Sequence, residues 1–115
     1  MKQLRTSEKF RIYREVGKIL RTAHPELFPV RGRRPPLKKG ILRELIALHG
    51  EKVTATKIRV FLRVWTHSTS YLMSLSRGGS RLGIGAVTCE SVMERHMKEA
   101  AECVRNRKLK TRPIC

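Results

Sequence analysis

Hydrophobic and polar positions alternate with the period of an α-helix over most of this chain. From about Ser7 to Ala23, apolar side chains recur every three or four residues, which predicts a helix that buries one face. Pro25 follows that stretch and is expected to end the helix. The apolar positions of the predicted face are Phe10, Tyr13, Val16, Ile19, Leu20 and Ala23.

A second helix is predicted from just after Pro36 to His49, and it follows a loop rich in glycine, proline and arginine, "LFPVRGRRPP". Gly50 stands where a helix C-cap often takes a positive φ angle. The apolar stripe of this helix comprises Leu37, Ile41, Leu42, Leu45, Ile46 and Leu48.

A third helix is predicted to begin after Thr54 or Thr56, either of which can serve as its N-cap, and to end near Trp65. The stretch "THSTS" interrupts the pattern with four hydroxyl side chains, and a short helix through Tyr71 and Leu72 follows. The buried face of the third helix is expected to hold Ile58, Phe61, Leu62 and Trp65.

The period changes late in the chain, where "SRGGSRLGIGAVT" predicts a β-hairpin or a pair of short strands. The last predicted helix runs from about Val92 to Arg107. Ser91 and Glu94 have the spacing of a capping box, and a cap one or two residues to either side fits the sequence equally well. The fold class is therefore mainly α (α+β), a helical domain with a small β-hairpin. We divide the chain into a helical region 1–26, a core 27–107 and a basic tail 108–115.

Charge narrows the possible partners. The 115 residues carry a formal net charge of +17, and no acidic residue occurs between Glu51 and Glu90. A one-sign surface repels itself, so an external anion is expected, nucleic acid before an anionic membrane or an acidic protein. All nine acidic residues are Glu. The lack of Asp disfavours a metal-dependent nuclease or phosphoryl-transfer enzyme.

The cysteines and the ends of the chain give no sign of a metal site, cofactor or leader. Cys89, Cys103 and Cys115 are widely spaced and form no zinc-binding pattern, so we expect reduced thiols. "MKQLRTSEKF" lacks the apolar stretch of a signal peptide, and no run reaches the length of a membrane span. We expect a cytoplasmic protein.

The acid-free segment contains the candidate contacts to an anion. Arg59 and Arg63 lie four residues apart, so their side chains share one face of the third helix, with Lys57 close by. A helix that begins at "THSTS" would offer unpaired N–H groups beside the hydroxyls of Thr66, Ser68 and Thr69. The alternative for these hydroxyls is an ordinary N-cap. Tyr71 either stacks on a base or fills the core.

Three stretches, "FPVRGRRPPLKKGI", "IRVFLRVWTHSTSYL" and "GGSRLGIG", resemble the ProQ/FinO family of bacterial RNA-binding proteins in order and spacing. The resemblance runs from about Leu27 to Arg107. It implies a small helical fold with a hairpin that is not an enzyme and that binds a stem-loop with a single-stranded 3′ tail, such as a terminator. Family members protect small RNAs and, in several cases, promote pairing with their targets.

The resemblance also implies a set of RNA-binding positions, to which the neighbouring cations Lys39 and Lys57 are added. They are Lys38, Arg59, Arg63, Tyr71 and Arg81, with Thr66, Ser68 and Thr69 at the helix N-terminus that holds the RNA 3′ end. The chain departs from the family pattern at Gly83 and Gly85, where relatives often carry Asp, and at Ser70, where a basic residue is common.

Three other classes of protein remain as alternatives. Helices two and three could form a DNA-binding helix-turn-helix or nucleoid protein. A ribonuclease could use His24, His49, His67 or His96, although His67 has no acidic neighbour in sequence to orient it. A membrane-surface peptide is the weakest alternative, because a shared core explains the apolar faces.

Overall fold

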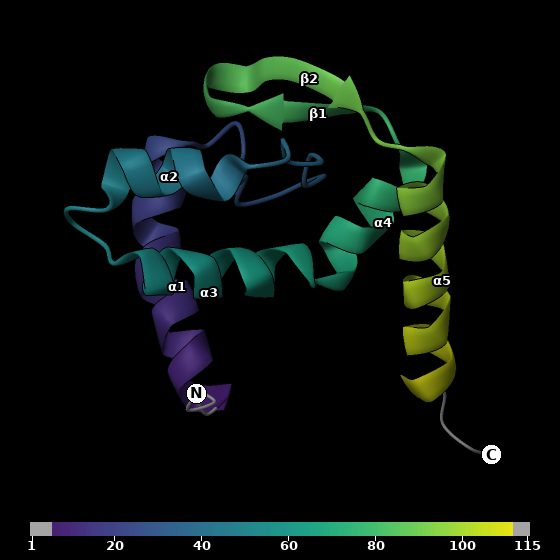
Figure 1. Cartoon of the computed structure of the whole chain (residues 1–115). Helices are drawn as coiled ribbons and strands as arrows, with labels where there is room; N and C mark the ends of the chain where they lie inside the picture. The colour runs from purple at the N-terminus through teal and green to yellow at the C-terminus, as the bar shows by residue number, and fades with distance from the viewer. Residues whose placement is uncertain (1–5, 112–115) are drawn as a thin grey trace.

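Five helices and a two-stranded antiparallel sheet make up residues 6–111, the part of the chain that the computed structural model describes (Figure 1). A 3-10 turn, Ile84–Ala86, joins the two strands, and the predicted mainly helical fold with a late hairpin is confirmed. The elements are α1 (Thr6–Ala23), α2 (Ile41–His49), α3 (Ala55–Thr66), α4 (Thr69–Arg77), β1 (Ser80–Gly83), β2 (Val87–Ser91) and α5 (Glu94–Thr111).

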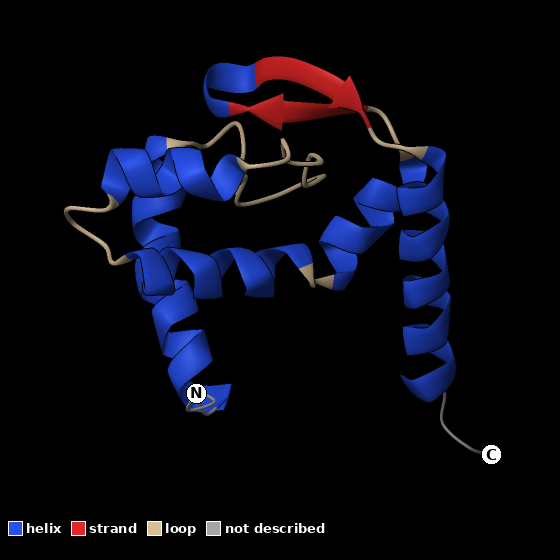
Figure 2. Cartoon of the chain, in the orientation of Figure 1, coloured by secondary structure: helices blue, strands red, loops and turns tan. Residues whose placement is uncertain are grey.

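Helices α3 and α4 follow one another through the middle of the molecule, and α1 and α5 lie at opposite ends of this pair (Figure 1). The closest helix pairs are α1 with α3 and α4 with α5. Figure 2 shows the hairpin on one side of the molecule, next to the long loop between α1 and α2. No helix within residues 6–111 combines the length and apolar character needed to cross a bilayer.

The core is built around aromatic rings on α3. Phe61 and Trp65 are fully buried, and each makes a T-shaped contact with the Phe28 ring, with centroids 5.2 Å apart in both pairs. Tyr13 of α1 stacks on Phe61 at 5.0 Å. The predicted buried face of α3 is confirmed, as is its N-cap, because the Thr54 hydroxyl accepts the Lys57 N–H.

The predicted buried face of α1 is only partly correct. Val16 and Leu20 are buried, but Phe10 is 52% exposed and Ile19 is 38% exposed. Gly17 is buried as well, and a Cβ atom there would lie 3.3 Å from the Phe61 ring. Helix α1 therefore meets α3 closely around Gly17, which sets the buried face and leaves the first turns of α1 beyond the core.

Helix α2 begins at Ile41, later than predicted, because the residues before it pair with the hairpin. Leu37 forms a parallel bridge with Leu82, and the Lys38 N–H donates to the Leu82 carbonyl at 2.9 Å. Gly50 has φ −61°, so the predicted left-handed cap is wrong. A Cβ at position 50 would lie 2.5 Å from the Ile46 carbonyl oxygen, and this close approach explains the glycine.

The start of α5 also differs from the prediction. Ser91 ends β2, pairing with Ser80, and α5 begins at Glu94, so the expected Ser91–Glu94 capping box does not form. Val92 is buried, and its N–H donates to the Gly79 carbonyl at 2.9 Å. Helix α5 continues to Thr111, so the first residues of the stretch predicted as a tail are helical.

Candidate nucleic-acid interface

Three cations on α3 form an uncompensated positive surface. Lys57, Arg59 and Arg63 are all exposed, and none makes an ion pair or side-chain hydrogen bond within the described residues. Arg59 and Arg63 lie four residues apart on one face, where like charges repel by roughly 0.2–0.5 kcal/mol in an isolated helix. An anion placed between them would remove that repulsion.

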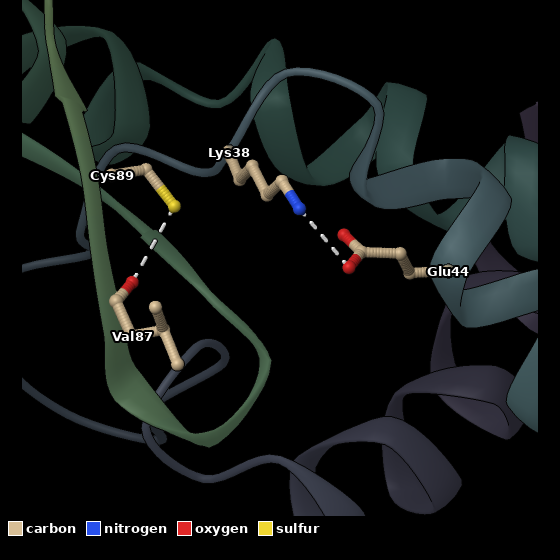
Figure 3. Close-up of polar contacts among 4 residues, drawn as sticks. All are labelled: Lys38, Glu44, Val87 and Cys89. Atoms are coloured by element: carbon tan, nitrogen blue, oxygen red, sulfur yellow. Dashed lines mark hydrogen bonds and ion pairs between the residues drawn. The ribbon is translucent and has the colours of Figure 1, made fainter.

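Lys38 and Lys39, predicted together, have different surroundings. The Lys38 ammonium lies 3.1 Å from Glu44 Oε1, as Figure 3 shows, so its charge is balanced within the chain. Lys39 is exposed, and its ammonium lies 3.9 Å from the Met93 sulfur. Lys39 is thus the less compensated of the two lysines. In Figure 3 the Cys89 thiol is directed toward the Val87 carbonyl.

The hydroxyls predicted as donors to an anion all bond within the chain. Thr66 donates to the Leu62 carbonyl at 2.8 Å, and Thr69 accepts a bond from Arg107 at 3.2 Å. Ser68 donates to Trp65 and accepts from both the Tyr71 N–H and Arg34. The N-cap alternative is therefore correct for Ser68, whose hydrogen-bonding capacity is used by the fold.

Tyr71 belongs to the core. It is 5% exposed, and its hydroxyl accepts the Leu37 N–H at 3.0 Å. Burial raises the pKa of Tyr71, while the Leu37 hydrogen bond and the nearby Arg81 charge oppose that shift. The ring therefore fills the core, and its stacking on a base stays a prediction.

Arg81 is a buried cation at the junction of β1, α4 and α5. It is 8% exposed; its Nη1 donates to the Leu37 carbonyl at 2.8 Å, and its Nη2 lies 3.5 Å from His96 Nδ1. Its Nε is buried and has no partner among the described residues. Arg81 also lines a cavity of about 280 Å³, together with Leu72, Leu75, His96, Glu99, Ala100 and Cys103.

These contacts give Tyr71 and Arg81 a role in the fold besides the RNA contact that the resemblance implies. Both side chains bind backbone groups of the same buried residue: the Tyr71 hydroxyl accepts the Leu37 N–H, and Arg81 donates to the Leu37 carbonyl. Removing either one leaves a buried backbone group without its partner, and such groups are costly. An RNA contact to Arg81 must come through the cavity that it lines.

Arg33 and Arg34, in the loop between α1 and α2, contact distant parts of the chain, and the sequence pattern did not reveal these contacts. Arg33 donates to the Ser74 hydroxyl and the Gly78 carbonyl, each at 2.8 Å. The Arg34 guanidinium lies 3.7 Å from the centroid of the Trp65 ring. The cluster of arginines around Gly32 was visible in the sequence, but their partners lie more than thirty positions away. These two arginines anchor the loop, and their charges are partly used in doing so.

The two relatives reported below by sequence carry the same name, RNA chaperone ProQ. A family model described as "ProQ/FINO family" matches residues 11–113. The chain is 32% identical over 105 residues to the RNA chaperone ProQ of Idiomarina loihiensis, covering 90% of this chain and 50% of that protein. It is 30% identical to the RNA chaperone ProQ of Vibrio vulnificus, covering 90% and 51%. The chain thus spans about half the length of the curated relatives it matches.

Solved structures share the fold. A FinO-like RNA chaperone from Neisseria meningitidis MC58 superimposes with a TM-score of 0.69 at 18% identity, covering 90% of this chain and 86% of that one. A ProQ homolog from Legionella pneumophila gives 0.69 at 21% identity, covering 100% and 97%. With the family model matching most of its length, this chain belongs to the ProQ/FINO family.

Proposed function

We propose that this protein binds structured RNA as a chaperone, taking terminator-type stem-loops with a single-stranded 3′ tail. The observation that carries the proposal is the exposed, uncompensated set Lys57, Arg59 and Arg63 on α3. The names of its relatives, RNA chaperone ProQ, support RNA as the anion.

The mechanism rests on charge and on shape. Lys and Arg side chains neutralise phosphates and release counterions, so affinity falls steeply with salt. RNA is chosen over DNA by its A-form backbone and by the docking of a free 3′ end. A protein bound in this way protects the 3′ end and can hold an RNA for pairing with a target.

No catalytic step is proposed. His24 and His49 bond to one another through their Nε2 atoms at 2.8 Å, and His67 Nδ1 lies 2.8 Å from its own helix's Arg63 carbonyl. These contacts serve packing and helix termination. Incubating labelled RNA with pure protein tests the point, since specific cleavage products would indicate a ribonuclease.

The double variant Arg59→Gln/Arg63→Gln tests the RNA-binding surface. Affinity for a labelled terminator hairpin should fall by about tenfold, and the slope of log affinity against log salt should shrink by about 2, one for each lost phosphate contact. Fluorescence anisotropy at several salt concentrations measures both quantities.

The matched control is Arg14→Gln/Lys18→Gln, which removes two exposed cations at the same spacing from α1. Equal losses in the two variants would mean that net charge, and not the α3 surface, governs binding. A wild-type protein that ignores the hairpin at moderate salt, or that prefers duplex DNA in competition, would refute the proposal. Removing the RNA 3′ tail should weaken binding more than changing the stem sequence.

A further inference from the structure

Two glutamates of helix α5 lie away from one of its faces. Glu99, Glu102 and Arg107 border a hollow of about 430 Å³ on one face, together with Cys103 and Asn106. Successive residues of an α-helix are rotated by 100°, so a residue two positions further along the chain points the other way. The α5 residues related in this way border a different hollow, and they are Ala101, Val104, Arg105 and Lys108. The acidic residues of this part of α5 are thus kept away from the second hollow.

The second hollow, here called the α4–α5 groove, has about 330 Å³ of space. Its lining comes from two helices: Met73, Ser76 and Arg77 of α4, and Ala101, Val104, Arg105 and Lys108 of α5. Every charged residue in that lining is basic. Arg77 and Arg105 are exposed, and neither makes an ion pair within the described residues.

Between these cations the groove offers apolar surface. Val104 is 8% exposed, and Met73 is half-buried. A methionine thioether adapts its shape and makes favourable contacts with aromatic rings. The volume lies at the small end of the roughly 300–1,000 Å³ range of ligand clefts. Cations on both helices, with apolar side chains between them, match a ligand that carries both anionic groups and a flat aromatic ring.

We propose that the α4–α5 groove binds a single-stranded segment of RNA, with phosphates at Arg77 and Arg105 and a base over Met73 and Val104. An acidic peptide without aromatic residues would satisfy the cations but offers no ring to Met73 and Val104. The inference deepens the proposed function, on which it rests, because it gives the unpaired part of the RNA a place separate from the α3 surface and from the Arg81 cavity.

The methionine methyl groups report on this site directly. Met73 lines the groove, whereas Met97 packs beside Gly78 and Met93 lies next to Lys39. Spectra of full-length protein labelled with ¹³C-methyl methionine are recorded during titration with a short oligoadenylate, whose purine rings shift nearby methyl resonances. The Met73 methyl should move, while the Met93 and Met97 methyls move much less. An unmoved Met73 methyl, or equal movement of all three, would overturn the proposal.

Inorganic polyphosphate and oligoglutamate separate the ligand classes. Both carry negative charge without a base, so neither should reproduce the ring-induced shift at Met73. If oligoglutamate shifts Met73 as strongly as oligoadenylate and displaces it at matched charge, the groove binds acidic polypeptide and the proposal fails.

The double variant Arg77→Gln/Arg105→Gln tests the cations. Its affinity for oligoadenylate should fall by about tenfold, against at most about twofold for Arg43→Gln/Arg95→Gln, which removes two exposed cations elsewhere. Equal loss in the two variants would overturn the groove while hairpin binding by the wild type still upheld the proposed function. Wild-type binding of oligoadenylate but not of hairpins would uphold the groove and refute the proposed function, and binding of neither would refute both.

Discussion

The two halves of this molecule bury different kinds of side chain. In the half formed by α1, α2 and α3, buried aromatic and aliphatic side chains make one continuous core around Phe61 and Trp65, which also takes in Tyr71 of α4. In the half formed by α4, the hairpin and α5, buried positions include Ser74 and Arg81, which are held by hydrogen bonds. The hollows described above, at the Arg81 cavity, on α5 and in the α4–α5 groove, all lie in this second half.

The difference indicates that the two halves contribute differently to stability and to recognition. A dense apolar core fixes α3 in place and leaves its exposed face free to carry uncompensated charge. The half with less apolar packing keeps grooves, which a ligand can fill. Stability and recognition should therefore respond to different substitutions.

The largest expected effect is on the core of the first half. Trp65→Ala should lower the free energy of unfolding by about 3–5 kcal/mol, because it leaves a cavity among Phe28, Phe61 and Arg34. Val104→Ala in the second half should cost only about 1–2 kcal/mol. Urea denaturation followed by circular dichroism measures both. Similar losses would contradict the division between the halves.

A smaller effect is expected where the halves meet. Tyr71→Phe keeps the ring but leaves the buried Leu37 N–H without an acceptor, which should cost about 1–3 kcal/mol. Tyr13→Phe is the matched control, because that hydroxyl accepts only a 3.3 Å bond from Arg21 in a partly buried place. The control should stay within about 0.5 kcal/mol of wild type. If Tyr71→Phe is equally mild, Leu37 does not depend on this bond.

The smallest effect concerns pH. Burial lowers the pKa of His49 below 6.5, and the nearby His24 and Lys52 charges add to the shift. Because the unfolded chain binds this proton more tightly, the stabilisation is complete above pH 6.5 and is lost as the pH falls through the folded pKa. His49→Gln should flatten the dependence of unfolding free energy on pH below 6.5.

The exposed His67 provides the control for that measurement. His67→Gln removes an exposed ring that contacts only its own helix, and a flattening equal to that of His49→Gln would contradict the assignment to His49. Within the pair, His24 Nδ1 lies 3.7 Å from the Glu26 carboxylate, and its Nε2 lies 2.8 Å from His49 Nε2. A steeper profile in His49→Gln than in wild type would show that the assignment is wrong.

Sequence reasoning succeeded where local periodicity decides the outcome. The buried face of α3, its Thr54 cap and the late hairpin all follow from patterns a few residues long. It failed at the start of α2, where the pairing of Leu37 with Leu82 overrides the helical pattern. A window of a few residues cannot contain both partners of that bridge.

The candidate site shows the same limit. Residue types identified Arg59 and Arg63 as exposed cations, because a helix face can be assigned from spacing. The roles of Ser68 and Tyr71 could not be read in this way, since their partners Arg34 and Leu37 lie 34 positions earlier. The basic side of α5 was also missed, because the residues that flank it, Met73 and Arg77, belong to another helix.

The bridge between Leu37 and Leu82 has a consequence for how the molecule assembles. Arg81 and Leu37 are 44 positions apart along the chain, so their contact closes a long loop, and we expect it to form late in folding. During synthesis, α1 to α3 can gather before β1 has left the ribosome. Lys38 and Lys39 would then reach their final places only when the hairpin docks, so a nascent chain would acquire its complete basic surface at the last step of maturation.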